Sequence, residues 1–88
     1  MKRVRVVVSG RVQGVFFRAD CERVAVARGL AGFVRNLPNG DVEAAFEGPD
    51  ADVDAAAAWC SEGPVLALVG RVEVSPEPTT GESGFRIR

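Results

Sequence analysis

The stretch VRVVVSGRVQGVFFRADCERVAVARG, residues 4–29, changes its hydrophobic period half-way along. Over residues 4–8, Val recurs at every second position, which is the pattern of a half-buried β-strand. From Phe17 onward, apolar residues recur at the spacing of an amphipathic α-helix, and Gly29 is typical of a helix C-terminus. The stretch therefore predicts a strand, a glycine-containing loop and a helix, which together form the first half of a βαβ unit.

The rest of the chain continues to alternate between strand and helix patterns. Leu37–Gly40 has the composition of a turn, and its Asn-Gly pair is a strong hairpin signal. Gly48-Pro49 breaks the strand that follows, and Asp50 is suited to cap a second helix that stops at Gly63-Pro64. The elements expected after Gly29 are strands at 31–36 and 41–47, a helix from 50 to about 62, and strands centred on 71–75 and 85–87.

The predicted elements specify one architecture. Each strand has only one strongly apolar side, so both helices must cover the same face of a mostly antiparallel sheet. The order of strands and helices is that of the split βαβ, ferredoxin-like arrangement. We therefore expect an α+β sandwich, with a four- to five-stranded sheet and two helices on one face, as a single domain over residues 1–88. Because many unrelated activities use this fold, it does not by itself predict the function.

The composition argues against several classes of function. Eleven basic and twelve acidic residues leave a net charge of −1, without the basic excess that is usual in nucleic-acid-binding proteins. The outward strand positions are Arg, Glu, Asp and Ser, and lack the aromatic pair of an RNA-binding sheet. No apolar run approaches the length of a membrane span, and Arg5 interrupts the only N-terminal run that could resemble a signal peptide. We expect a cytoplasmic protein that binds neither nucleic acid nor membranes.

The chain contains no histidine, which removes the usual general base and the commonest metal ligand. Cys21 and Cys60 cannot form a zinc site alone. Antiparallel helices would place Cys21, near the start of the first, close to Cys60 at the end of the second. A disulfide is one interpretation, but free buried thiols are the expectation in a reducing compartment. We expect neither a metal ion nor a cofactor.

The loop between Gly10 and Arg18 has the features of an anion site. Backbone N–H groups at a helix N-terminus have no internal partner, and the helix dipole is positive there. Gly14 would allow the chain to curl so that successive N–H groups converge, and Arg18 could add a bidentate contact to a phosphate. The competing interpretation is an ordinary glycine-bracketed turn with a solvated Arg18. The loop is neither a Walker P-loop nor a dinucleotide-binding glycine loop.

The run from Gly10 to Arg18 resembles the signature of the acylphosphatases, small enzymes that cleave carboxyl-phosphate anhydrides. The second motif of that family is present as Gly32-Phe33-Val34-Arg35-Asn36, followed by Gly40, Val42 and Gly48. The similarity extends over the whole chain, including Trp59 and the C-terminal Gly84-Phe85-Arg86-Ile87-Arg88. Two independent motifs at the expected separation argue against a chance similarity.

The resemblance implies a metal-independent hydrolase that converts an acyl phosphate into a carboxylate and inorganic phosphate. It implies that Arg18 binds the phosphoryl group and that Asn36 orients the attacking water. The implied phosphate-binding loop is Gln13, Gly14, Val15, Phe16, Phe17 and Arg18. Gln13 and residues 15–17 would act through their backbones, so their side chains should matter less. The implied partners are a small-molecule acyl phosphate and inorganic phosphate, which is both product and inhibitor, and we expect a monomer.

Two alternatives to this enzyme remain open from the sequence. A non-catalytic binding module of the same fold would not need Asn36, which could simply cap the turn before Pro38. A related domain also occurs inside larger carbamoyl-transferring maturation proteins, and the single-domain length of this chain favours a stand-alone enzyme.

The other conspicuous side chains are expected to be structural. The strand arginines are interpreted as solvated surface charges, or alternatively as a cationic field that attracts anionic substrates. These arginines are Arg3, Arg5, Arg86 and Arg88. Trp59 is expected at the border of the apolar stripe of the second helix, and Phe17, Phe46 and Phe85 in the core.

Overall fold

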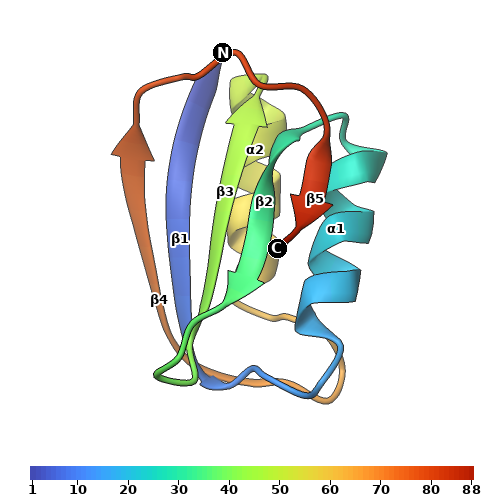
Figure 1. Ribbon diagram of the computed structural model, residues 1–88, viewed down its shortest axis with the longest axis vertical. Helices are drawn as coiled ribbons and strands as arrows, with labels where there is room; N and C mark the ends of the chain where they lie inside the picture. The colour runs from blue at the N-terminus through green and yellow to red at the C-terminus, as the bar shows by residue number, and fades with distance from the viewer.

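The computed structural model describes all residues, 1–88, as one five-stranded sheet with two helices on one face (Figure 1). The elements in chain order are β1 (Lys2–Arg11), α1 (Phe17–Ala27), β2 (Ala31–Asn36), β3 (Val42–Gly48), α2 (Asp50–Cys60), β4 (Leu68–Glu77) and β5 (Phe85–Ile87). The strand order is β4-β1-β3-β2-β5, in which only the β2–β5 pair is parallel. The predicted arrangement is therefore confirmed, with the short last strand as the fifth.

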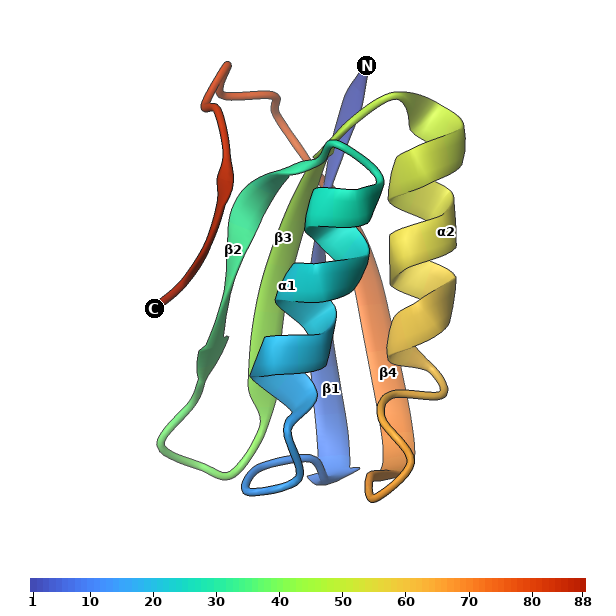
Figure 2. The ribbon, with the colours of Figure 1, turned by 90° about the vertical axis from the view of Figure 1, so that its right-hand side faces the viewer.

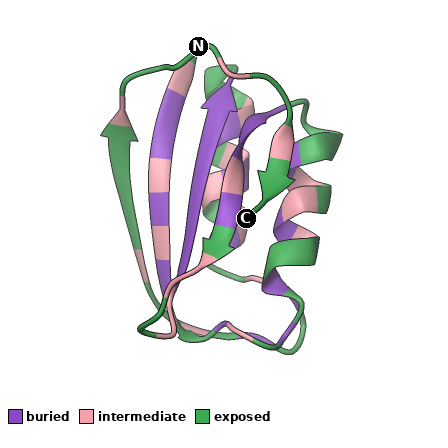
Figure 3. Cartoon of the chain, viewed as in Figure 1, coloured by how far each residue is buried: buried purple, intermediate pink, exposed green.

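The core lies between the sheet and the two helices, which run antiparallel side by side (Figure 2). The alternation that predicted β1 is confirmed, because Val4, Val6 and Val8 are all buried. Phe46 of β3 is fully buried and stacks on Phe85 of β5, with 5.7 Å between ring centroids. The central strand β3 is buried along its entire length (Figure 3).

The ends of the two helices differ in how well local sequence predicted them. At the end of α1, the N–H of Leu30 donates to the carbonyl of Ala25 and that of Gly29 to Val26, which is the expected glycine C-cap. At the start of α2, the expectation that Asp50 caps the helix is wrong. Pro49 occupies the N-cap position, with ψ of 140°, so that Asp50 already lies in the first turn and contacts the N-terminal amine. No helix of the chain is long and apolar enough to cross a membrane.

Strand β4 is longer than the predicted 71–75, and β3 is shifted by one residue from the predicted 41–47. β4 pairs with β1 from Leu68 opposite Arg11 to Glu77 opposite Arg3. Pro76 lies within this pairing, which is tolerated because β4 is an edge strand and the proline nitrogen needs no partner there.

Arg3 is not the solvated charge expected from the sequence. It is only 7% exposed, and its guanidinium donates to carboxylates of Glu47 (3.1 Å), Glu77 (3.1 Å) and Glu82 (2.7 Å). The connection from β4 to β5 covers this end of the sheet, because the backbone N–H groups of Thr80 and Gly81 donate to Glu47. The N–H of Thr80, helped by that of Gly81 and by the Arg3 guanidinium, lowers the pKa of Glu47 to about 2.

The other predicted structural side chains lie largely where expected. Arg86 and Arg88 are exposed, and the Arg88 guanidinium lies 4.1 Å from the centroid of the Phe33 ring. Trp59 packs at the border of the core against Phe17, with 5.1 Å between ring centroids. The Cys21 and Cys60 thiols are free and fully buried, and hydrogen bonding to Cys60 together with burial raises the pKa of Cys21.

Candidate active site

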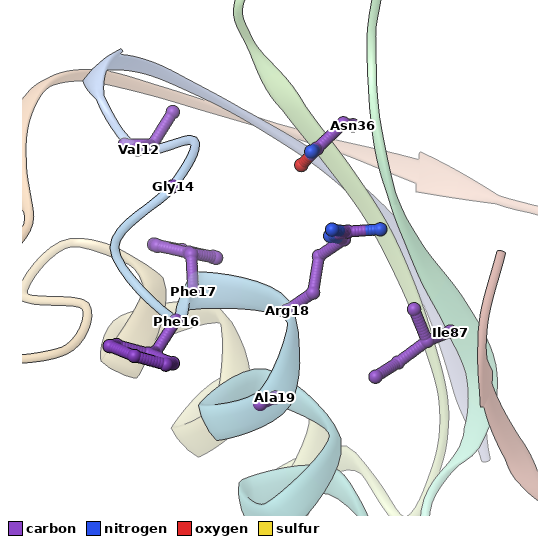
Figure 4. Close-up of a pocket in the computed structure, with 8 residues that line it drawn as sticks. All are labelled: Val12, Gly14, Phe16, Phe17, Arg18, Ala19, Asn36 and Ile87. Atoms are coloured by element: carbon purple, nitrogen blue, oxygen red, sulfur yellow. The ribbon is translucent and has the colours of Figure 1, made fainter.

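A cleft of about 350 Å³ opens where the β1–α1 loop, the end of β2 and β5 meet (Figure 4). It is lined by Val12, Gly14, Phe16, Phe17, Arg18, Ala19, Asn36 and Ile87. Arg18 and Asn36, the two predicted catalytic residues, therefore share one cleft although they belong to different elements. No carboxylate lines it, so the only formal charge on its walls is that of Arg18.

The loop that leads into α1 has an unusual backbone. Gly14 and Phe16 both have positive φ angles, of 73° and 66°. Phe16 is the N-cap of α1, and it is the only non-glycine residue of the chain in the left-handed region. For a residue with a side chain this conformation costs roughly 1–2 kcal/mol, and such strain is typical of functional sites. The strained residue, Phe16, lies where the loop turns into the first turn of α1.

The backbone N–H groups of residues 13–19 donate no hydrogen bond within the protein. Outside the helices and strands, the first backbone donor after β1 is Asp20, whose N–H reaches the carbonyl of Phe16 at 3.1 Å. The loop and the first turn of α1 thus present a continuous series of free donors at the positive end of a helix dipole. This is the arrangement of an anion site.

The Arg18 side chain extends from the first turn of α1 into the cleft, on the side where Asn36 lies (Figure 4). It is exposed and forms no ion pair with any carboxylate of the chain. Its five N–H donors are therefore available to an external anion.

Asn36 is the last residue of β2, where it is paired with Val42 of β3. Capping of the following turn, which was the competing interpretation of Asn36, is performed by Asn39, whose Oδ1 accepts the N–H of Asp41 at 3.0 Å. The half-buried side-chain amide of Asn36 forms no hydrogen bond within the protein and faces the cleft. It is thus a free donor and acceptor beside Arg18.

The remaining predicted loop residues separate into two groups. Gly14, Phe16 and Phe17 line the cleft with Arg18, whereas Gln13 and Val15 do not. Val15 is buried in the core. The Gln13 amide nitrogen donates to the carbonyls of Leu37 (2.8 Å) and Asp41 (2.9 Å), a side-chain role that the sequence did not indicate.

Ile87 is a cleft residue that sequence reasoning missed. It lies on β5, which pairs in parallel with β2 and so brings the C-terminal residues beside the cleft. The alternation of Phe85 and Ile87 predicted a strand, but nothing in the sequence placed that strand next to β2.

The residues present offer no evident metal site. The chain has no group of three or more His, Cys, Asp or Glu side chains placed to hold a metal ion. What the cleft offers chemically is a set of backbone donors, one guanidinium and one neutral amide.

Comparison with known proteins supports a single family. The acylphosphatase family model matches residues 4–87. An acylphosphatase of Rubrobacter xylanophilus is 56% identical over 88 residues, covering 99% of this chain and 80% of the relative. The crystal structure of an acylphosphatase from Bacillus subtilis has a TM-score of 0.95 at 34% identity, covering 100% of this chain and 99% of that one. HypF of T. kodakarensis is similar over 99% of this chain but only 12% of its own length, with a TM-score of 0.82 and 35% identity.

Proposed function

The chain belongs to the acylphosphatase family and is an enzyme that hydrolyses acyl phosphates, and from this premise we propose how its cleft performs the reaction. The N–H groups of residues 13–18 and the Arg18 guanidinium bind the phosphoryl group. Asn36 orients the water that attacks phosphorus, and the products are a carboxylate and inorganic phosphate.

Phosphate binding by the loop is supported by the free donors described above. The loop presents N–H groups without protein acceptors, and its left-handed residues, Gly14 and Phe16, hold it in a curled conformation. Arg18 adds a charged donor that no carboxylate neutralises. Donors fixed before the substrate arrives stabilise the charge on the transferring oxygens without reorganising during the reaction.

Asn36 suits the water-positioning role because it is neutral and bifunctional. Its carbonyl can accept a hydrogen bond from water while its NH₂ group donates one to a neighbouring oxygen. A carboxyl phosphate has a good leaving group, so the enzyme must mainly bind the dianion, hold water in line and stabilise the transition state. A phosphoryl oxygen of the substrate accepts the proton of the attacking water, and this makes a histidine base unnecessary.

The observation that carries the proposal is the meeting of Arg18 and Asn36 in one cleft, both without a protein partner, beside a loop of free N–H groups. We further propose that inorganic phosphate competes for the same loop. We also propose that the chain acts as a cytoplasmic monomer with one domain. Sedimentation equilibrium tests whether the protein is a monomer. A single unfolding transition that coincides for different probes tests whether it is one domain.

The roles are tested by hydrolysis of benzoyl phosphate and acetyl phosphate. Arg18→Ala should lower kcat/KM roughly 10²–10³-fold, the usual cost of losing a charge-stabilising donor. Arg11→Ala is the matched control, because Arg11 is exposed, forms no ion pair and precedes the cleft-lining Val12 without lining the cleft itself. A folded Arg18→Ala with near-wild-type activity, or an equal loss in both variants, would reject a direct role for Arg18.

Asn36→Ala should lower kcat much more than it weakens inhibition by inorganic phosphate. Loss of phosphate inhibition with turnover retained would show that Asn36 binds phosphate and does not position water. Activity of the wild-type protein should survive exhaustive chelation, since no step uses a metal ion.

A further inference from the structure

We propose that the side-chain amide of Gln13 is a positioning group that fixes Asn36 relative to the phosphate-binding loop. This inference rests on the proposed function, because it assigns Gln13 a role that acts through Asn36. It differs from the expectation that the Gln13 side chain matters less than its backbone.

The contact joins the two halves of the cleft. The backbone of Gln13 belongs to the loop and directly precedes Gly14, which lines the cleft. Its side-chain nitrogen donates to the carbonyl of Leu37 at 2.8 Å and to that of Asp41 at 2.9 Å. Leu37 directly follows Asn36 in the chain. One planar amide therefore connects the phosphate-binding loop to the residue next to the water-positioning side chain.

The hairpin turn does not need Gln13 to stay closed. The N–H of Leu37 donates to the carbonyl of Asp41 at 2.8 Å, and that of Gly40 donates to the carbonyl of Leu37 at 3.1 Å. Each carbonyl that accepts from Gln13 thus already has one partner from within the turn, and a carbonyl oxygen can accept two hydrogen bonds. Removing the Gln13 side chain leaves no carbonyl of this pair without a partner. What is lost is the link between the turn and the loop.

The chemistry of the contact selects an amide. Both acceptors are carbonyl oxygens, so the group between them must supply two donors from one atom, as the NH₂ of glutamine does. A glutamate of the same shape would direct a carboxylate oxygen at two carbonyl oxygens and could donate only when protonated. Glutamine at residue 13 therefore holds the turn close to the loop, whereas the carboxylate of a Gln13→Glu variant would repel the two carbonyl oxygens of the turn.

Catalysis is expected to be sensitive to this link because water must attack in line. Misplacement of a reacting group by about 1 Å can cost on the order of 10²-fold in rate. Gln13→Ala should thus lower kcat roughly 10–100-fold, with KM and the inhibition constant of inorganic phosphate changed far less. Gln13→Glu should be slower still at neutral pH, and its kcat relative to wild type should recover as pH falls and the carboxyl group protonates.

A double-mutant cycle with Asn36→Ala decides whether Gln13 acts through Asn36. We would measure kcat for wild type, both single variants and the double variant, with urea unfolding to establish that each is folded at the assay temperature. Gln13→Ala should cost much less in the Asn36→Ala background than in the wild type. The same factor in both backgrounds, or unchanged kcat in Gln13→Ala, would overturn the proposal.

The cycle also separates this inference from the proposed function. If Asn36→Ala alone keeps the wild-type kcat, the water-positioning role itself is wrong. If Asn36→Ala is slow and the Gln13 effect stays additive, only the positioning role of Gln13 is wrong. The pH dependence of kcat in Gln13→Glu gives an independent readout. If its kcat relative to wild type recovers at low pH no more than that of Gln13→Ala does, the hydrogen bonds of residue 13 are not the cause of the effect.

Discussion

Gly63→Ala tests whether tight packing beneath Phe17 holds the start of the helix that carries Arg18. Gly63 lies in the connection between α2 and β4, has a φ of +65° and donates its N–H to the carbonyl of Trp59 at 2.9 Å. A methyl group at this position would lie 2.9 Å from Cε2 and 3.2 Å from Cδ2 of Phe17. The Phe17 ring is 2% exposed and packs against Trp59, so it cannot move aside without disturbing that contact.

Two effects add in this variant, and a matched glycine separates them. The left-handed backbone costs an alanine roughly 1–2 kcal/mol, and overpacking against a fixed ring typically costs about 1–3 kcal/mol. Gly29 has nearly the same φ, +68°, and also follows a helix, but no heavy atom lies within 4 Å of a methyl group built there. Gly29→Ala therefore carries only the backbone cost. Gly63→Ala should be less stable than Gly29→Ala by about 1–3 kcal/mol, and each kcal/mol lowers Tm by roughly 4–8 °C in a domain of this size.

Urea unfolding followed by far-UV circular dichroism measures both free energies, and benzoyl phosphate hydrolysis measures the effect on the site. Because Phe17 directly precedes Arg18, Gly63→Ala should also lower kcat at temperatures where it is fully folded, and Gly29→Ala should not. Equal losses of stability in the two variants would refute the packing argument, since only Gly63 has the ring beside it.

Acidification should destabilise the fold over the pH range in which Glu47 becomes protonated. The hydrogen bond from the N–H of Thr80 helps to lower the pKa of Glu47 from 4.5 to about 2. The stability contributed by this carboxylate is present above pH 4.5 and is lost as pH falls toward 2, so the urea midpoints of wild type and Glu47→Gln should converge over that interval. The buried thiols should react slowly with a thiol reagent in the native protein, and titration in urea without reductant should find two, Cys21 and Cys60; finding none would mean a disulfide. Ile87→Glu places a carboxylate in the cleft proposed to bind the phosphoryl group and should raise KM more than the uncharged Ile87→Gln; equal effects would mean that shape and not charge is responsible.

Local patterns predicted the elements whose boundaries depend on local chemistry. The strand at residues 31–36 has the predicted bounds, and the first helix begins at Phe17 and ends before Gly29. The extent of β4 could not be predicted in the same way. Leu68 and Pro76 belong to the strand only because β1 runs beside them. Pairing with Arg11 and Val4, which lie 57 and 72 residues away in the sequence, leaves no local signal.

The site residues that belong to the family motifs could be predicted from the sequence. Residues whose role depends on a contact between distant elements could not. Arg18 and Asn36 were expected to share a site, and they line one cleft. The bonds of the Gln13 side chain span 24 and 28 residues, and Ile87 reaches the cleft only through the parallel pairing of β5 with β2. Arg3 was interpreted as exposed because the segment that covers it, residues 78–84, comes from the opposite end of the chain.

The distribution of ion pairs explains how a protein with a net charge of −1 presents a cationic cleft. Seven of the eleven basic side chains pair with carboxylates, and none of these pairs includes a residue that lines the cleft. The four basic side chains without an ion pair are Arg11, Arg18, Arg86 and Arg88. Each of them either lines the cleft or is adjacent in sequence to Val12 or Ile87, which line it. Because no carboxylate lines the cleft and Arg18 has no ion-pair partner, an approaching dianion meets a positive charge there despite the net charge of the protein. Attraction of an anionic substrate would thus depend on the absence of carboxylates from the cleft as much as on the guanidinium of Arg18.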